Sequence, residues 1–255
     1  MVRVRAVLGL MAVLVLLSGC SRHKQARVEV PPPPSPGPAT PNTPASPAPK
    51  PSAPADKVEE ADETFKSIPE NATPLLTETG RASWYGAPYH NRRGSNGEIY
   101  NMHAMTAAHR TLPLGSIVRV TNEKTGHSAL VRITDRGPFV QGRILDVSYA
   151  AAQRLDIWQP GVATVKVEVL QTPTPLSTGG KWAVQIGRFE DQKTATDLAD
   201  RLSRRYQTAK VAKFSSPTGA WWVRVRVLND DRQRAESLMH ETETTEGSVY
   251  LVRLD

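Results

Sequence analysis

Three side chains between residues 98 and 135 are of types that enzymes use to move protons: Glu98, His109 and Asp135. The segment 128–135 alternates apolar and polar residues, and Asp135 has the parity of its apolar members. We therefore expect this carboxyl at the rim of a β-sheet core, where partial burial favours the protonated form. A protonated carboxyl can donate to the leaving oxygen of a glycosidic bond, so the pattern is compatible with sugar cleavage.

Each of these residues could also have a purely structural role instead of a catalytic one. Asp135 precedes a Gly-Pro turn and could cap that turn or pair with Arg136 or Arg143. Glu98 follows Asn-Gly, a turn pair, and could be an ordinary exposed glutamate. His109 could end a short helix and interact with its C-terminus. Residue types alone favour one of these structural roles for Asp135, the turn cap or the arginine pair, over a role in catalysis.

The elements that must position these residues are short strands. Between residues 80 and 170, aromatic and β-branched residues alternate with turn signals, which predicts a mainly β domain. The pattern also predicts two short helices, at 103–109 and 148–155. The expected strands are 82–85, 117–122, 128–135, 143–146 and 163–170.

The last 75 residues, 181–255, have a different pattern. Their hydrophobic periodicity predicts a βαββαβ order, which gives an antiparallel sheet with both helices on one face. The expected strands are 182–187, 211–214, 221–227 and 248–252, and the expected helices are 193–206 and 231–240. A Thr/Pro linker, 171–180, separates this α+β domain from the first one.

Strand alternation places one polar group of side chains on the open face of this sheet: Gln185, Trp222, Arg224 and Arg226. An amide, a stacking aromatic ring and guanidinium donors suit a glycan that carries hydroxyls and N-acetyl carbonyls. The alternative is that the arginines only solvate the exposed face, while Trp222 packs over a helix edge.

The N-terminus predicts export and lipid attachment. Arg3 and Arg5 precede an apolar run, 7–17, that is too short to span a bilayer but fits a signal peptide. The chain's one cysteine, Cys20, follows Ser18-Gly19, and this resembles a lipobox. We expect a signal peptide over 1–19 and a lipid on Cys20. Ser21 is not the aspartate associated with inner-membrane retention, which favours the outer membrane.

Residues 20–79 are expected to form a disordered linker. Twelve of the 24 residues from 31 to 54 are proline, which favours extended polyproline II over helix or sheet. The acidic run 56–78 contains few apolar residues. A tether from a lipid into the cell wall needs reach without a fold, and this composition provides it.

The formal net charge of +7 could attract nucleic acid, but export removes that partner, and an anionic wall polymer is the expected target. The six histidines lack the spacing of metal ligands, and no second cysteine exists. No phosphate-binding glycine loop or nucleotide motif occurs. We therefore expect neither a metal nor a cofactor.

A series of motifs between Gly80 and Ser148 resembles the rare lipoprotein A family. These motifs are Gly80-Arg81-Ala82-Ser83-Trp84-Tyr85-Gly86, Asn96-Gly97-Glu98, Thr106-Ala107-Ala108-His109, Asp135-Arg136-Gly137-Pro138-Phe139, Gly142-Arg143 and Asp146-Val147-Ser148. The resemblance implies a double-psi β-barrel, related to the barrels of expansins and of one class of membrane-bound lytic transglycosylases. It also implies a cleft lined by Asp135, Glu98 and His109.

One departure concerns the loop before Glu98. Gly94-Ser95 stands where the family usually shows Thr-Ala, so a threonine hydroxyl and a methyl are lost. We expect this loop to be more flexible. Trp84 and Tyr85 could stack on sugar rings, but as consecutive strand residues they must face opposite sides.

The C-terminal segment resembles the SPOR domain, a peptidoglycan-binding module of division and sporulation proteins. The resemblance rests on 182–187 with Phe189 and on 222–227, while Leu228-Asn229-Asp230 stands where the family often has Gly-Pro. It implies a preference for glycan strands stripped of stem peptides, which accumulate at the septum.

Together the resemblances imply a septal lytic transglycosylase that forms 1,6-anhydro products. Asp135 would be the acid and then the base, with Glu98 and His109 orienting the substrate or tuning Asp135. The alternatives are a non-catalytic wall-binding lipoprotein and expansin-like loosening without bond cleavage. The sequence identifies no protein partner.

Overall fold

The computed structural model describes residues 65–255 apart from residues 208 and 245. All of them belong to one compact unit, Ser52–Asp255. The expected signal peptide, the expected lipidation site Cys20 and the Pro-rich segment lie outside the described residues. Within the described part, no helix is both long enough and apolar enough to cross a membrane.

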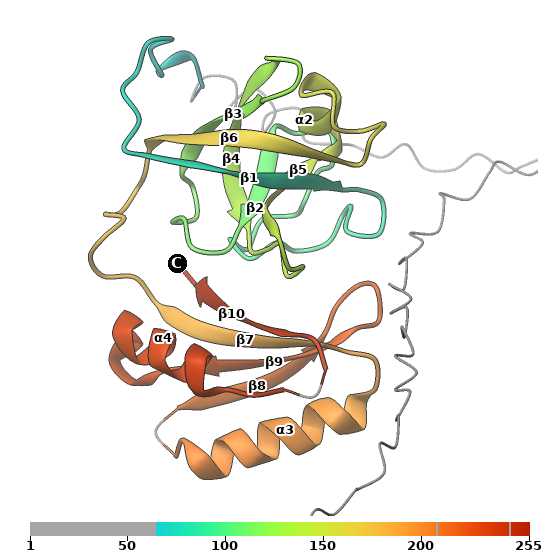
Figure 1. The fold of residues 1–255 in the computed structure, drawn as a ribbon, viewed down its shortest axis with the longest axis vertical. Coiled ribbons are helices and arrows are strands. Elements are labelled where there is room, and N and C mark those ends of the chain that lie inside the picture. The colour runs from blue at the N-terminus through green and yellow to red at the C-terminus, as the bar shows by residue number, and fades with distance from the viewer. Residues whose placement is uncertain (1–64, 208, 245) are drawn as a thin grey trace, which may run out of the picture. The chain divides into compact units, whose positions relative to one another are not determined.

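The first domain is a closed six-stranded barrel with the order β1-β5-β2-β4-β3-β6 (Figure 1). Two pairs, β1 with β5 and β2 with β4, are parallel, and the other neighbours are antiparallel. A short helix, α2, follows β5. The elements are β1 (Leu76–Tyr85), β2 (Thr106–His109), β3 (Ile117–Asn122), β4 (Ser128–Asp135), β5 (Arg143–Ser148), α2 (Tyr149–Arg154) and β6 (Val162–Gln171). The predicted double-psi β-barrel is confirmed.

Branched aliphatic side chains fill the barrel, as alternation along its strands requires. Val118 and Val120 of β3, Val131 and Ile133 of β4, and the alternate valines of β6 are fully buried in one cluster. The apolar parity assigned to 128–135 is therefore correct up to Ile133. Beyond it a register shift in the β2–β4 pairing makes Ala108 the partner of Asp135, which is the last residue of β4.

Two predictions from the sequence were wrong, one about the type of an element and one about the start of a strand. The expected helix at 103–109 is instead strand β2, because Thr106–His109 is buried between β4 and β5 and pairs with both. Tertiary pairing overrides the helical tendency of an alanine-rich run. The first strand also begins at Leu76, inside the segment expected to be linker, and pairs there with Val169 of β6.

The second domain is a four-stranded antiparallel sheet with the order β10-β7-β9-β8. Its elements are β7 (Trp182–Phe189), α3 (Gln192–Arg205), β8 (Lys210–Ser215), β9 (Trp221–Arg226), α4 (Arg232–Glu241) and β10 (Ser248–Arg253). The predicted βαββαβ order is confirmed. In the turn where the family often has Gly-Pro, Leu228–Asp230 forms a short 3-10 helix.

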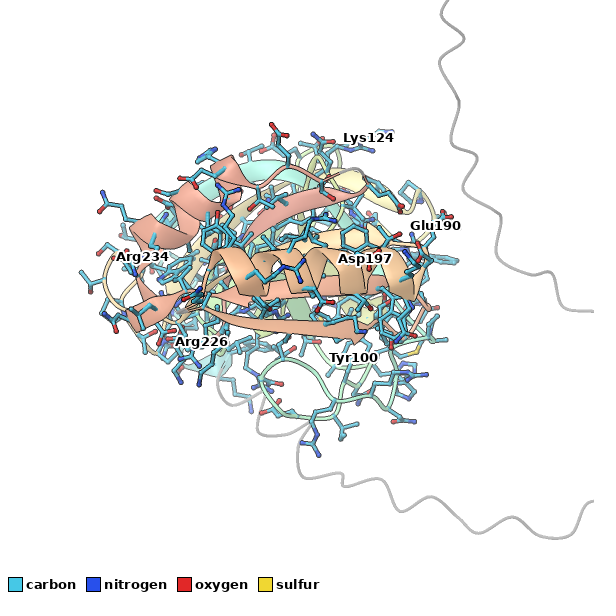
Figure 2. All side chains as sticks on the ribbon, turned by 90° about the horizontal axis from the view of Figure 1, so that it is seen from below. Tyr100, Lys124, Glu190, Asp197, Arg226 and Arg234 are labelled. Atoms are coloured by element: carbon cyan, nitrogen blue, oxygen red, sulfur yellow. The ribbon has the colours of Figure 1, made fainter. Side chains whose placement is uncertain are left out.

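Both helices cover the same face of this sheet. Alternate apolar residues of β7 and β9 share one buried cluster with Leu198 and Leu202 of α3 and with Leu238 of α4. In Figure 2, α3 crosses in front of the sheet and carries the labelled Asp197. Aspartates cap both helices: Asp191 accepts from the Thr194 N–H, and Asp231 accepts from the Arg234 N–H.

Candidate active site

A cavity of about 360 Å³ is lined by several side chains that can transfer protons or form hydrogen bonds. Its barrel wall comes from β1, β2, β4 and β5 and from the loops that follow β1 and β4. The facing wall comes from β7, β8, β9 and the β8–β9 loop. A volume in this range is typical of small-ligand sites. The chemically active side chains in its lining are Tyr85, Tyr100, Asp135, Asp146, Gln185 and Arg224.

The carboxylate of Asp135 is held from one side only. Its Oδ1 accepts hydrogen bonds from the Ser95 main-chain N–H at 3.0 Å, from the Ser95 hydroxyl and from the Arg136 main-chain N–H at 2.7 Å. No hydrogen bond from the described residues reaches Oδ2. One oxygen is therefore fixed by the protein, while the other is available to a molecule in the cavity.

No arginine side chain pairs with Asp135 within residues 65–255. The Arg136 guanidinium turns away and donates to the main-chain oxygens of His109, Leu112 and Asp255. Burial lowers the pKa of Arg136 to about 10. Arg143 instead reaches Asp146. The two arginine pairings considered from the sequence are therefore wrong, and Asp135 keeps a free oxygen beside the Gly-Pro turn.

The loop that departs from the family pattern contacts Asp135 directly. Ser95 replaces an alanine of that pattern, and its hydroxyl is one of the three donors to Oδ1. The hydroxyl lost at Gly94 is thus accompanied by one gained at the next residue. Sequence reasoning treated this loop as a source of flexibility and missed Ser95 as a ligand of the carboxylate.

Glu98 does not line the cavity. Its two carboxylate oxygens accept from Arg132 of β4, at 3.2 Å and 2.8 Å. This paired geometry fastens the loop 93–99 to the strand that ends at Asp135. The structure therefore places Glu98 where it can position the Ser95 loop, and not where it would touch a bound sugar.

His109 is also outside the cavity lining. Ala108 lines the cavity, and the next residue along β2 points the other way, so the His109 ring is buried. Its Nδ1 accepts from the N–H groups of Thr111 and Leu112, which leaves Nε2 to donate to Glu78 at 3.3 Å. Burial lowers the pKa of His109, which favours the neutral form of the ring. The helix-end interpretation of this residue is wrong, because β2 is a strand.

A second carboxyl, Asp146 of β5, lines the same cavity. Burial raises its pKa, although Arg143 and the hydrogen bond from Ser83 oppose that shift. The Ser83 hydroxyl donates to Oδ1 at 2.6 Å. Asp146 stands in one of the quoted motifs, yet sequence reasoning gave it no role. The signal available in the sequence was an aspartate between apolar residues in the middle of a strand.

Aromatic rings form part of the barrel wall. Tyr85 and Tyr100 stack with ring centroids 4.3 Å apart, and the Tyr100 hydroxyl donates to the main-chain oxygen of Tyr85. Burial raises the pKa of Tyr100, so its hydroxyl remains a donor. The neighbouring Trp84 packs instead against the barrel core. Of the consecutive aromatic pair, Tyr85 is therefore the one that faces the cavity.

Three of the four residues expected on the open sheet face line the cavity: Gln185, Trp222 and Arg224. The face is not open, since Gln185 is 1 % and Trp222 6 % exposed. The Trp222 ring lies 5.3 Å from that of Phe139, a barrel residue, and Arg224 donates twice to Gln185 Oε1. Trp222 does not pack over a helix edge.

Arg226 is separate from this group. It lies two residues further along β9, near the end of the sheet (Figure 2), and does not line the cavity. Its guanidinium pairs with Asp230 at 2.6 Å and 2.8 Å, within the 3-10 turn. Within the described ranges, no cluster of three or more His, Cys, Asp or Glu could hold a metal ion.

The closed barrel with its partly free carboxylate and the βαββαβ sheet place the chain in the class of proteins that join a small β-barrel to an α+β module. A family model described as lytic transglycolase matches residues 77–167, and the SPOR domain model matches residues 178–253. Together the two matches cover more than half of the chain. The chain therefore carries a lytic transglycolase domain followed by a SPOR domain, and it is similar to curated RlpA proteins.

Curated relatives carry the name endolytic peptidoglycan transglycosylase RlpA. The Vibrio cholerae protein is 54% identical over 150 residues, which cover 56% of this chain and 57% of that protein. A Neisseria meningitidis protein is 56% identical over 100 residues, covering 39% and 42%. The match thus spans about half the length of these relatives. A solved expansin of Clavibacter michiganensis is 14% identical, covers 60% of this chain and 81% of that chain, and has a TM-score of 0.31.

Proposed function

We propose that this chain is a lytic transglycosylase that cleaves the bond between N-acetylmuramic acid and N-acetylglucosamine in peptidoglycan. The observation that carries the proposal is the Asp135 carboxylate, with Oδ1 held by Ser95 and Arg136 and Oδ2 free in a cavity of ligand size. The names of the relatives support the same activity.

In the proposed reaction, Asp135 acts first as acid and then as base. Its proton passes to the glycosidic oxygen as the bond from muramyl C1 to that oxygen breaks, and N-acetylglucosamine leaves with a hydroxyl. The muramyl 6-hydroxyl then attacks C1 and returns its proton to the Asp135 carboxylate. Because the nucleophile is intramolecular, no second carboxyl is needed to activate water, and proximity provides much of the rate.

Glu98 and His109 enter this proposal as positioning residues. Glu98 acts through Arg132 on the loop that carries Ser95. His109 holds the turn after β2 through Thr111 and Leu112, and its main-chain oxygen accepts from Arg136. Both residues thereby support the segments that hold Oδ1 of Asp135, without contact to the sugar.

Asp135→Asn tests the assignment. It keeps the size of the side chain but removes the transferable proton, and we expect loss of 1,6-anhydro products, by a factor of about 100 or more, with glycan binding retained. Mass spectrometry of stripped glycan strands after incubation with each protein provides the measurement. Reducing ends would indicate a hydrolase, and bound but intact glycan a binding module. Undiminished turnover would remove Asp135 from the mechanism.

The proposal extends to location. We infer a cell-envelope protein with a lipid on Cys20, tethered by the Pro-rich segment, preferably to the outer membrane. Gln185, Trp222 and Arg224 would bind denuded glycan strands and so place the barrel at the division septum. Arg226 was expected to contribute as well, but its pairing with Asp230 and its position outside the cavity favour a structural role.

A further inference from the structure

We propose that the barrel and the SPOR sheet bind one and the same glycan segment, in a composite site with Asp135 on one wall and Gln185, Trp222 and Arg224 on the other. The inference rests on the proposed function for its substrate class. It goes beyond that function because it makes the second domain part of the active site. A module that served only for targeting would instead bind a different stretch of the wall.

The first support is the way the sheet is attached to the barrel. The Phe139 ring lies 5.3 Å from Trp222 and 5.7 Å from Tyr250 between ring centroids. The end of β10 adds main-chain hydrogen bonds, since the Arg253 N–H donates to the oxygen of Arg110 at 3.0 Å. These contacts hold the polar sheet face against the part of the barrel that carries Asp135.

The Asp255 oxygen strengthens this attachment. It accepts from the Leu114 N–H at 3.1 Å and from Arg136 Nη2 at 2.6 Å. The main-chain N–H of that same Arg136 donates to Asp135. The residue that helps to hold the proposed catalytic carboxylate therefore also fastens the last strand of the second domain.

The second support is unused hydrogen-bonding capacity on the sheet wall. Gln185 is 1 % exposed, and its Oε1 accepts from Arg224 Nε and Nη2 at 3.0 Å and 2.6 Å. Gln185 Nε2 and Arg224 Nη1 donate to no described residue. Both groups therefore keep a capacity to donate that the described residues do not use. Both residues line the cavity, so a bound glycan can supply the missing acceptors.

The third support is charge. Burial lowers the pKa of Arg224 and the negative charge of Asp135 opposes that shift, so the two groups are within electrostatic range. In an intact wall the lactyl group of muramic acid forms an amide with the stem peptide. In a denuded strand it is a free carboxylate, which a guanidinium binds strongly. We assign Arg224 as the group that recognises this free lactyl carboxylate.

Isothermal titration with a denuded tetrasaccharide tests the composite site. The whole chain carries Asp135→Asn, which prevents turnover. We expect one tetrasaccharide per chain. Arg224→Gln, and Arg92→Gln on the barrel wall, should each weaken that single event, the first by about tenfold or more. Arg226→Gln is the matched control, because this arginine lies on the same strand outside the cavity, and it should leave the affinity unchanged.

Two outcomes would overturn the inference. One is a stoichiometry of two independent oligosaccharides per chain, with the sheet and barrel substitutions each affecting a different one. The other is an Arg224→Gln affinity equal to that of the control. Arg92 is exposed, so its replacement reports on the barrel wall even if Arg224→Gln fails to fold. Binding does not require cleavage. If the unsubstituted chain released no anhydro products while the Asp135→Asn chain still bound one tetrasaccharide, only the proposed function would be contradicted.

The carboxylate assignment has its own readout. A tetrasaccharide with amidated lactyl groups should bind the otherwise unchanged protein about tenfold less tightly than the free acid. Arg224→Gln should abolish this difference. Equal affinity for the two oligosaccharides would show that Arg224 does not recognise the lactyl group.

Discussion

At the scale of single residues, the buried His109–Glu78 pair makes the stability of the barrel depend on pH. Burial lowers the pKa of His109 below its ordinary value of 6.5, so the unfolded chain binds more protons as the pH falls through 6.5. The hydrogen bond from His109 lowers the pKa of Glu78 below 4.5. The stability gained from both groups is therefore present at neutral pH and lost on acidification, first through His109 and then through Glu78.

We predict that the free energy of unfolding falls as the pH drops from about 7 to 5, with a slope of at most about 1.4 kcal/mol per pH unit from this one ring. His109→Gln should lower stability at pH 7 and flatten the slope. Urea unfolding followed by circular dichroism at several pH values measures both effects. A slope equally steep in His109→Gln would contradict the assignment.

The sequence was most informative about Asp135 and least informative about its surroundings. Strand parity and a turn signal place a carboxyl at the end of a core strand, and both are local features. The donors to Oδ1 could not be inferred in this way, because Ser95 reaches Asp135 across 40 positions of the chain. The same holds for Asp146, whose partner Ser83 is 63 positions away.

At the scale of elements, the loop 93–99 connects the ion pair of Glu98 to the carboxylate of Asp135. Its backbone is closed by a hydrogen bond from the Gly94 N–H to the Glu98 oxygen at 2.8 Å and by a bridge between Arg93 and Ile99. Displacing Glu98 would therefore move Ser95 as well. Glu98 acts on the site through this loop in the present proposal.

We predict that Glu98→Gln and Arg132→Gln reduce kcat by similar factors, about three- to tenfold, and that the double variant is no worse than either one. An exposed ion pair contributes only about 0.2–1 kcal/mol to stability, so folding should be nearly unchanged. Steady-state release of anhydro products gives the comparison. If Glu98→Gln were far more damaging than Arg132→Gln, Glu98 would act on the substrate itself.

Regular elements were largely predictable, and the errors have physical causes. The strands and helices of the second domain follow clear periodicity, and aspartates at 191 and 231 start its helices. The strand β2 was mistaken for a helix because four buried residues carry too little pattern to show a period. Alternation correctly separated the two faces of the SPOR sheet, but it could not show that the barrel covers one of them.

At the scale of the whole molecule, the lipid attachment that we propose at Cys20 would decide where the two domains can act. We predict that Cys20→Ser releases the protein from the membrane fraction while leaving its activity on soluble glycan strands unchanged, because the change lies far along the chain from the barrel. Fractionation of cells with antibody detection, together with the mass of the N-terminal peptide, provides the measurement. A protein that stays membrane-bound and carries the same mass after this substitution would contradict the anchor.

The pairing of β1 with β6 has a mechanical consequence. Leu76 lies opposite Val169, so the chain enters and leaves the barrel at the same edge, and the Leu75 N–H donates to the Val169 oxygen at 2.7 Å. Suppose that the lipid holds one end and the wall holds the SPOR domain. Tension would then peel these two strands apart one hydrogen bond at a time, starting at Leu75. The Asp255 contacts to Leu114 and Arg136 act in parallel with that seam and would share the load when the envelope stretches.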